Sequence, residues 1–97
     1  MKVFISMPMN GKTREEIIKR RNEIADILTL RFPEQTITII DSLVDSIDVG
    51  PVWCLGYSIQ KMEDADLIVF DKGWRDARGC KVEYDVCSYY GFKFMEI

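Results

Sequence analysis

The residues best suited to chemistry lie in one stretch of the chain, which ends at Glu83. An apolar run, Leu67 to Phe70, is followed there by a loop that contains Gly73 and Gly79. A buried strand, a loop whose backbone can approach a phosphate and a carboxylate at the start of a helix form a common active-site arrangement in α/β proteins. We therefore expect Glu83 to be ionised in the first turn of a helix, where the helix dipole stabilises a carboxylate by about 0.3–1 kcal/mol. The alternative is that Glu83 is only the acidic residue that a helix start favours.

Two further aspartates follow apolar runs and are candidates for the same site. Asp71 comes directly after Phe70, and Asp41 comes directly after Ile40. For each of them a turn or capping role competes with catalysis. Asp71 is a candidate catalytic acid, as is Asp76 in the loop that precedes Glu83.

The same loop carries groups that suit an anionic or aromatic ligand. Arg75 and Arg78, together with backbone N–H groups, are candidates for binding a phosphate or a carboxylate, with a solvated loop as the alternative. Trp74 can stack on a base or anchor an interface. Near the N-terminus, Asn10 and Gly11 precede a helix start and offer backbone N–H groups to an anion.

Composition removes several kinds of chemistry. The chain has no histidine, which excludes Ser-His and Cys-His nucleophile systems. Its three cysteines are an odd number and lack the Cys-x-x-Cys spacing, so we expect neither a disulfide framework nor a structural zinc site. Catalysis must therefore use carboxylate, hydroxyl, amine, guanidinium or thiol groups, and we expect no metal and no cofactor.

Charge and hydropathy bear on partners and location. The net charge of -3 argues against a nucleic-acid polymer as partner, because phosphate backbones require a basic surface. No apolar run approaches the roughly 20 residues that span a bilayer, so we expect no membrane partner. The first residues enter a strand pattern directly, without a secretory hydrophobic region, and we expect a cytoplasmic protein.

Periodicity predicts alternating strands and helices. Thr13 and Glu16 have capping-box spacing, so a helix should begin near Arg14 and end before Pro33. Pro51 suits the first turn of a second helix. The predicted strands are 3–6, 36–40, 67–70 and 92–96, the third helix is 80–90, and 41–50 is a loop. The side chains expected to face inward are Ile17, Ile18, Ile24, Ala25 and Leu28, then Val52, Leu55, Ile59 and Met62, then Val82, Val86 and Tyr89.

This order of elements predicts a single α/β domain over residues 1–97. Right-handed crossovers give a flavodoxin-like, Rossmann-like three-layer fold, with a parallel four-stranded sheet of order 2-1-3-4 and three helices. The topological switch then lies between the first and third strands, so the loops 6–12 and 71–79 should meet at a ligand crevice. One helix covers one face of this sheet, and we expect homo-oligomerisation to cover that face further.

Two segments resemble a known family. The opening Val3-Phe-Ile-Ser-Met-Pro-Met-Asn-Gly11 and the later Ala65-Asp-Leu-Ile-Val-Phe, Gly73-Trp74 and Arg78-Gly-Cys-Lys-Val-Glu83 are similar to DUF4406. That family comprises small phage and bacterial proteins related to nucleoside 2-deoxyribosyltransferases and deoxynucleotide N-hydrolases. The resemblance covers nearly the whole chain.

The resemblance implies N-glycosidic chemistry on a nucleoside or nucleotide, with Glu83 attacking the anomeric carbon as nucleophile. Three positions depart from the family pattern: Ser58 replaces an aspartate that assists the leaving base, Met7 replaces a glycine, and Asp76 lies one residue before the related aspartate. We expect the ligand site to be lined by Ser6, Met7, Pro8, Asn10, Gly11, Ser58, Gly73, Trp74, Arg78 and Gly79.

The sequence leaves three functions open. The first is a nucleoside deoxyribosyltransferase or nucleotide N-glycosidase. The second, which Ser58 favours, is a nucleotide-binding or sensing module that has lost catalysis. The third is a phage or bacterial interaction protein without enzymatic activity, for which the thinly covered sheet face and Trp53 or Trp74 would serve.

Overall fold

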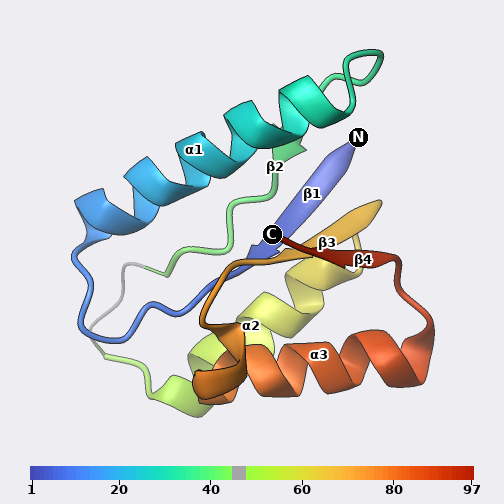
Figure 1. Ribbon diagram of the computed structural model, residues 1–97. Coiled ribbons are helices and arrows are strands. Elements are labelled where there is room, and N and C mark those ends of the chain that lie inside the picture. The colour runs from blue at the N-terminus through green and yellow to red at the C-terminus, as the bar shows by residue number, and fades with distance from the viewer. Residues whose placement is uncertain (45–47) are drawn as a thin grey trace.

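The computed structural model describes residues 1–44 and 48–97 and has a four-stranded parallel sheet between helices (Figure 1). The strand order β2-β1-β3-β4 confirms the predicted α/β, Rossmann-like fold, with its topological switch between β1 and β3. The elements, in chain order, are β1 (Lys2–Ser6), α1 (Arg14–Arg31), β2 (Thr38–Ile39), α2 (Pro51–Met62), β3 (Leu67–Phe70), a short 3-10 helix η1 (Trp74–Asp76), α3 (Arg78–Tyr90) and β4 (Phe94–Glu96).

The sheet separates two apolar clusters. Successive residues of a strand point to opposite faces, so Val3 and Ile5 of β1 pack with α1 while Phe4 packs with α2 and α3. Figure 1 shows α1 alone on one face of the sheet and α2 with α3 on the other. This arrangement of the three helices is the predicted one. Each side chain of β1 and β3 can therefore be assigned either to the α1 side of the sheet or to the side of α2 and α3.

The predicted helix boundaries rest on local hydrogen bonds. The Thr13 hydroxyl accepts from the backbone N–H of Glu16 at 3.1 Å, and the Glu16 carboxylate accepts from the N–H of Thr13 at 3.1 Å. This confirms the capping box that starts α1. Pro51 begins α2, and Gly91 ends α3 in the left-handed conformation with φ 71°. A left-handed residue after a helix favours glycine because glycine has no Cβ.

Two strands are shorter than predicted. β2 is an edge strand, and only Thr38 and Ile39 pair with β1. The N–H of Ile40 donates to Val3 O at 2.8 Å, and the strand ends there. β4 starts at Phe94 because the N–H of Phe92 still donates to Cys87 O, at 3.2 Å, in the turn that closes α3. Residues 41–44 and 48–50 form no helix or strand, in line with the predicted loop, whose residues 45–47 lie outside the described part.

The inward faces of the helices differ from the prediction at several positions. Val52 of α2 and Tyr89 of α3 are 80% and 83% exposed, so the inward orientation predicted for both is wrong. The third helix starts at Arg78, and its buried residues are Cys80, Glu83 and Cys87, while Val86 is half-buried against the same cluster. A face that includes a glutamate has a weak apolar signal, which is why periodicity misplaced it. None of the helices within residues 1–44 and 48–97 is long and apolar enough to cross a membrane.

Candidate active site

The centre of the candidate site is a hydrogen bond between a strand end and a helix. Ser6 is the last residue of β1, and its hydroxyl donates to Glu83 Oε1 at 2.7 Å. Both side chains are buried. Ser6 reaches Glu83 because alternation along β1 turns it toward α3, whose buried stripe contains Glu83. The pair therefore lies where the carboxyl end of β1 meets α3, beside the topological switch.

Glu83 differs from the prediction in position and in charge state. Since α3 begins at Arg78, Glu83 lies in the second turn, and the first turn contains no acidic residue. Burial raises the pKa of Glu83 to about 7, although the hydrogen bond from Ser6 and the charge of Arg21 act in the opposite direction. The expected ionisation by the helix dipole is thus outweighed by loss of solvent. At neutral pH both the carboxylate and the carboxylic acid are populated.

This raised pKa makes stability depend on pH in a defined direction. Between the ordinary value of 4.5 and the folded value of about 7, the folded chain binds more protons at Glu83 than the unfolded chain does. That contribution to the free energy of unfolding is complete below pH 4.5 and is lost as pH rises through 7. A rise in pKa from 4.5 to about 7 corresponds to about 3 kcal/mol in the free energy of unfolding.

We therefore expect Glu83→Gln, which cannot titrate, to gain stability relative to the wild type by about 3 kcal/mol between pH 4 and pH 8.5. Urea unfolding of both proteins across this range measures the difference. A difference that does not change with pH would contradict the raised pKa. Asp71 titrates in both proteins, so its contribution cancels in the comparison.

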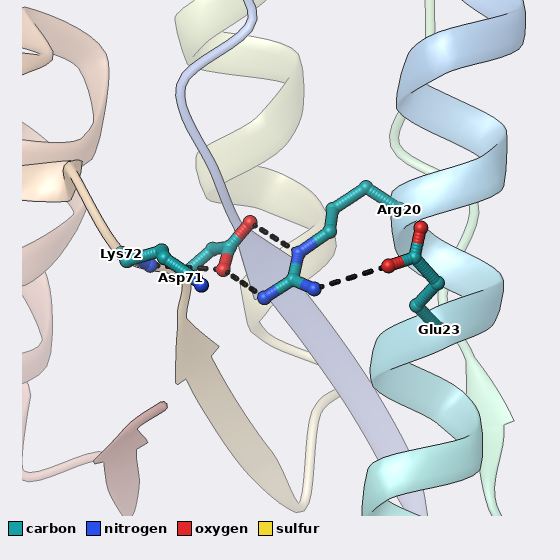
Figure 2. Close-up of polar contacts among 4 residues, drawn as sticks. All are labelled: Arg20, Glu23, Asp71 and Lys72. Atoms are coloured by element: carbon teal, nitrogen blue, oxygen red, sulfur yellow. Dashed lines mark hydrogen bonds and ion pairs between the residues drawn. The ribbon is translucent and has the colours of Figure 1, made fainter.

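Asp71, a candidate catalytic acid, is engaged elsewhere. Arg20 of α1 donates to both of its carboxylate oxygens, from Nε at 3.0 Å and from Nη2 at 2.8 Å (Figure 2). The N–H of Lys72 donates to Asp71 Oδ1 at 2.8 Å, and Arg20 also donates to Glu23 at 3.3 Å. Burial acts to raise the pKa of Asp71, but the bonds from Arg20 and Lys72 outweigh it and hold that pKa below its usual range. Asp71 is therefore an ionised group on the α1 side of the sheet, opposite to Glu83, and does not meet the requirement for a general acid.

A surface cavity of about 430 Å³ adjoins this ion pair on the α1 side. Its acidic side chains are all engaged, Glu16 in the capping box and Glu23 and Asp71 with Arg20. Three lysines complete the lining: Lys12, Lys19 and Lys72. It does not include Glu83.

Trp74 packs against other residues of the protein and is not available to stack on a ligand base. Its ring stacks on Tyr84 at 4.7 Å between centroids, and the Arg75 guanidinium lies over it at 4.6 Å. Its indole N–H donates to Glu96 at 2.8 Å, and Arg75 pairs with the same carboxylate at 2.9 Å. Because Trp74 is only 6% exposed, the predicted stacking of a ligand base on it has no open ring face.

The loops after β1 and β3 do meet, as predicted from topology. Asp71 N–H donates to Ser6 O at 2.9 Å, and a Cβ added to Gly73 would lie 3.6 Å from Pro8. Met7, however, which was expected to line the ligand site, is buried in the apolar cluster with α1. The remaining predicted ligand residues are placed as follows: Asn10, Gly11, Asp76 and Arg78 are exposed, Gly79 is half-buried at the start of α3, and Ser58 is buried on α2.

Two polar residues at this end of the sheet, Arg21 and Ser42, carried no prediction from the sequence. Arg21 occupies the buried stripe of α1 between Ile17 and Ile24, where an apolar residue is the norm. Its Nη2 donates to the hydroxyl of buried Ser42 at 2.9 Å. The signal was present in the sequence as a charged residue at the helical spacing of the core.

Two buried thiols share the inward stripe of α3 with Glu83. Burial raises the pKa of Cys80 and of Cys87 to about 11, so both thiols stay protonated at neutral pH. Within the described ranges, no three acidic or cysteine side chains are grouped to hold a metal ion.

Comparisons with protein-family models, curated proteins and solved structures give no match for this chain.

Proposed function

We propose that the chain cleaves the N-glycosidic bond of a nucleoside or nucleotide, with Glu83 as nucleophile. The observation that carries this proposal is the buried Ser6–Glu83 hydrogen bond of 2.7 Å at the carboxyl end of β1. A carboxylate there adjoins the place where Rossmann-like folds bind ligands. The resemblance of the two quoted segments to the deoxyribosyltransferase-related family supports the same role for Glu83.

The proposed reaction has two displacement steps. Ser6 occupies Oε1 of Glu83, so Oε2 forms the bond to the anomeric carbon while the bond from that carbon to the base nitrogen breaks. The electron pair leaves with the base, which takes up a proton. Water or a second base then attacks the same carbon, loses a proton, and releases Glu83 as a carboxylate. Ser6 orients the carboxylate in both steps.

The protonation of the leaving base is the step that the described residues support least. Asp71 is tied to Arg20, and Asp76 is exposed. Ser58, in place of the family's aspartate, has no carboxyl group to protonate a base. These observations favour the second candidate function, a nucleotide-binding module that has lost catalysis.

Chromatographic detection of free base distinguishes the two functions. The protein is incubated with a panel of deoxynucleosides and deoxynucleotides, and base release from one of them supports the enzyme. Absence of base release from the whole panel, together with a ligand-dependent rise in melting temperature, supports the binding module. A ligand at 100 times its Kd stabilises the folded chain by about 2.7 kcal/mol.

Ser58→Asp is expected to increase base release by about 100-fold, because a positioned general acid typically contributes that much or more. The rates of wild type and variant are compared on the best substrate of the panel, or on the tightest-binding one if the wild type is silent. Ser58→Asn is the matched control, since it has the shape of aspartate without an acidic proton. Equal rates for the aspartate and asparagine variants would exclude a general-acid role for this position.

A further inference from the structure

A buried guanidinium at the carboxyl end of β2 has few partners. Arg21 is 8% exposed and takes a core position on α1, one turn after Ile17. Its Nη2 donates to Ser42, which follows β2 and is itself 5% exposed. Its Nη1 lies 3.8 Å from Asp41, whose side chain is 83% exposed. The guanidinium thus extends from the core toward the surface between α1 and the segment after β2.

The nitrogen Nε of Arg21 is the informative atom. It is fully buried, and none of the residues in 1–44 and 48–97 accepts a hydrogen bond from it. Buried donors in native proteins are almost always paired, and an unpaired one costs about 1–3 kcal/mol. A buried donor of this kind is expected where a ligand supplies the acceptor.

The preceding residue of α1, Arg20, shows what kind of group binds to the Nε–Nη2 edge of a guanidinium. Arg20 uses Nε and Nη2 together to grip both oxygens of Asp71, at 3.0 and 2.8 Å (Figure 2). In Arg21 the Nη2 of the same edge donates to the Ser42 hydroxyl, while its Nε has no acceptor within the part of the chain that the structure describes. A two-oxygen anion matches this edge, and charge-assisted pairs of this type are the stronger hydrogen bonds.

The electrostatic surroundings of Arg21 favour the binding of an anion. Burial lowers the pKa of Arg21, and the charges of Asp41 and Glu83 only partly oppose that effect. A buried cation without a close carboxylate is costly, whereas a paired one is tolerated. Of these two carboxyl groups, Asp41 is exposed and beyond hydrogen-bonding distance, and Glu83 is half-protonated at neutral pH.

The sheet register relates this guanidinium to the candidate active site. Val3 pairs with Ile39, the last residue of β2, so Ser6 at the end of β1 and Ser42, three residues after β2, both follow the same edge of the sheet. Ser6 bonds to Glu83, and Ser42 bonds to Arg21. The carboxyl ends of two neighbouring strands thus carry a hydroxyl–carboxyl pair and a hydroxyl–guanidinium pair.

We propose that Arg21 and Ser42 form an oxyanion-binding subsite for a phosphate or carboxylate group of the ligand. The oxyanion accepts from Nε and Nη2 of Arg21, and Ser42 turns its hydroxyl hydrogen toward the same group. Asp41 gives way to the ligand, because its contact with Nη1 is long and exposed. The inference rests on the proposed function in one respect only: the anionic group belongs to the same ligand whose sugar Glu83 attacks.

The test measures anion binding without turnover. Inorganic phosphate and acetate are titrated into the wild type, Arg21→Met and Arg31→Met, and binding is followed by calorimetry and by the melting temperature. Arg31 is an exposed residue in the last turn of the same helix and serves as the matched control. We expect Arg21→Met to lose about tenfold or more in affinity for the preferred anion, while Arg31→Met binds as the wild type does. Whether phosphate or acetate binds more tightly identifies the anion.

Three results would overturn the proposal. The first is that the wild type binds neither anion. The second is that Arg21→Met binds the anions with the affinity of the wild type. The third is that the only effect of Arg21→Met is a higher pKa of Glu83. Methionine at a buried ionic position is commonly tolerated, and Ser42→Ala, expected to weaken binding in the same direction, provides a second variant if Arg21→Met does not fold. Anion binding in a protein that releases no base would leave this inference standing while the proposed reaction fails.

Discussion

Glu83→Gln is expected to lower the rate of base release by about 10⁴-fold or more, because removal of a nucleophile leaves only binding and orientation to accelerate the reaction. Glutamine keeps the shape of the side chain and can still accept from Ser6, so the crevice should retain its geometry. The loss should appear in kcat, with a smaller change in KM. Chromatography of the free base under single-turnover conditions measures it.

Asp85→Asn is the matched control for this experiment. It removes a carboxylate from the same helix, but from a side chain that is exposed. We expect its rate to equal that of the wild type. A Glu83→Gln protein that retains a tenth of the wild-type rate would show that the nucleophile is another group. In the active protein the rate should also rise through pH 7, since only ionised Glu83 attacks and its pKa is about 7.

The second large effect concerns stability. Arg20→Met is expected to lower the free energy of unfolding by about 3 kcal/mol, because it leaves the carboxylate of Asp71 buried without its cation. The side chain of Asp71 is only 4% exposed, so water cannot replace the two lost hydrogen bonds. Urea unfolding at pH 7 measures the change. The deficit should shrink below pH 4, where protonated Asp71 no longer requires a cation.

Glu23→Gln separates the buried pair from the exposed one. Glu23 is the other partner of Arg20, at 3.3 Å, and its side chain is 50% exposed. Exposed pairs of this kind contribute little, so we expect a change within about 0.5 kcal/mol. Equal destabilisation by Arg20→Met and Glu23→Gln would mean that the bidentate bond to Asp71 has no special weight.

The sequence predicted the architecture well because the signals for it are local. The capping box at Thr13, proline at the start of α2 and glycine at the end of α3 each depend on neighbouring residues. Once the order of strands and helices is known, right-handed crossovers leave few topologies. The strand order and the faces covered by the helices followed from those rules.

The site was predicted less well because its properties depend on distant residues. Glu83 was expected to be ionised by its own helix, but its pKa is set by burial under elements far away in the chain. Asp71 ended the expected strand, yet its partner Arg20 is 51 residues away. No spacing rule identifies such a partner. Arg21 was overlooked for a related reason, since helical periodicity reports apolar residues and treats a charged one as a gap.

Asp71 and Glu83 lie on opposite faces of the sheet, and the pKa of each is set by different residues. The groups that set the pKa of Asp71 are Arg20, Lys72 and Lys12, whereas Ser6 and Arg21 act on Glu83. Protonation on the α3 side thus leaves the ion pair on the α1 side intact. Substitutions that adjust the acidity of Glu83 can then accumulate without loosening the contact between α1 and β3. Such substitutions still change the free energy of unfolding through Glu83 itself, because the raised pKa of that group is coupled to folding.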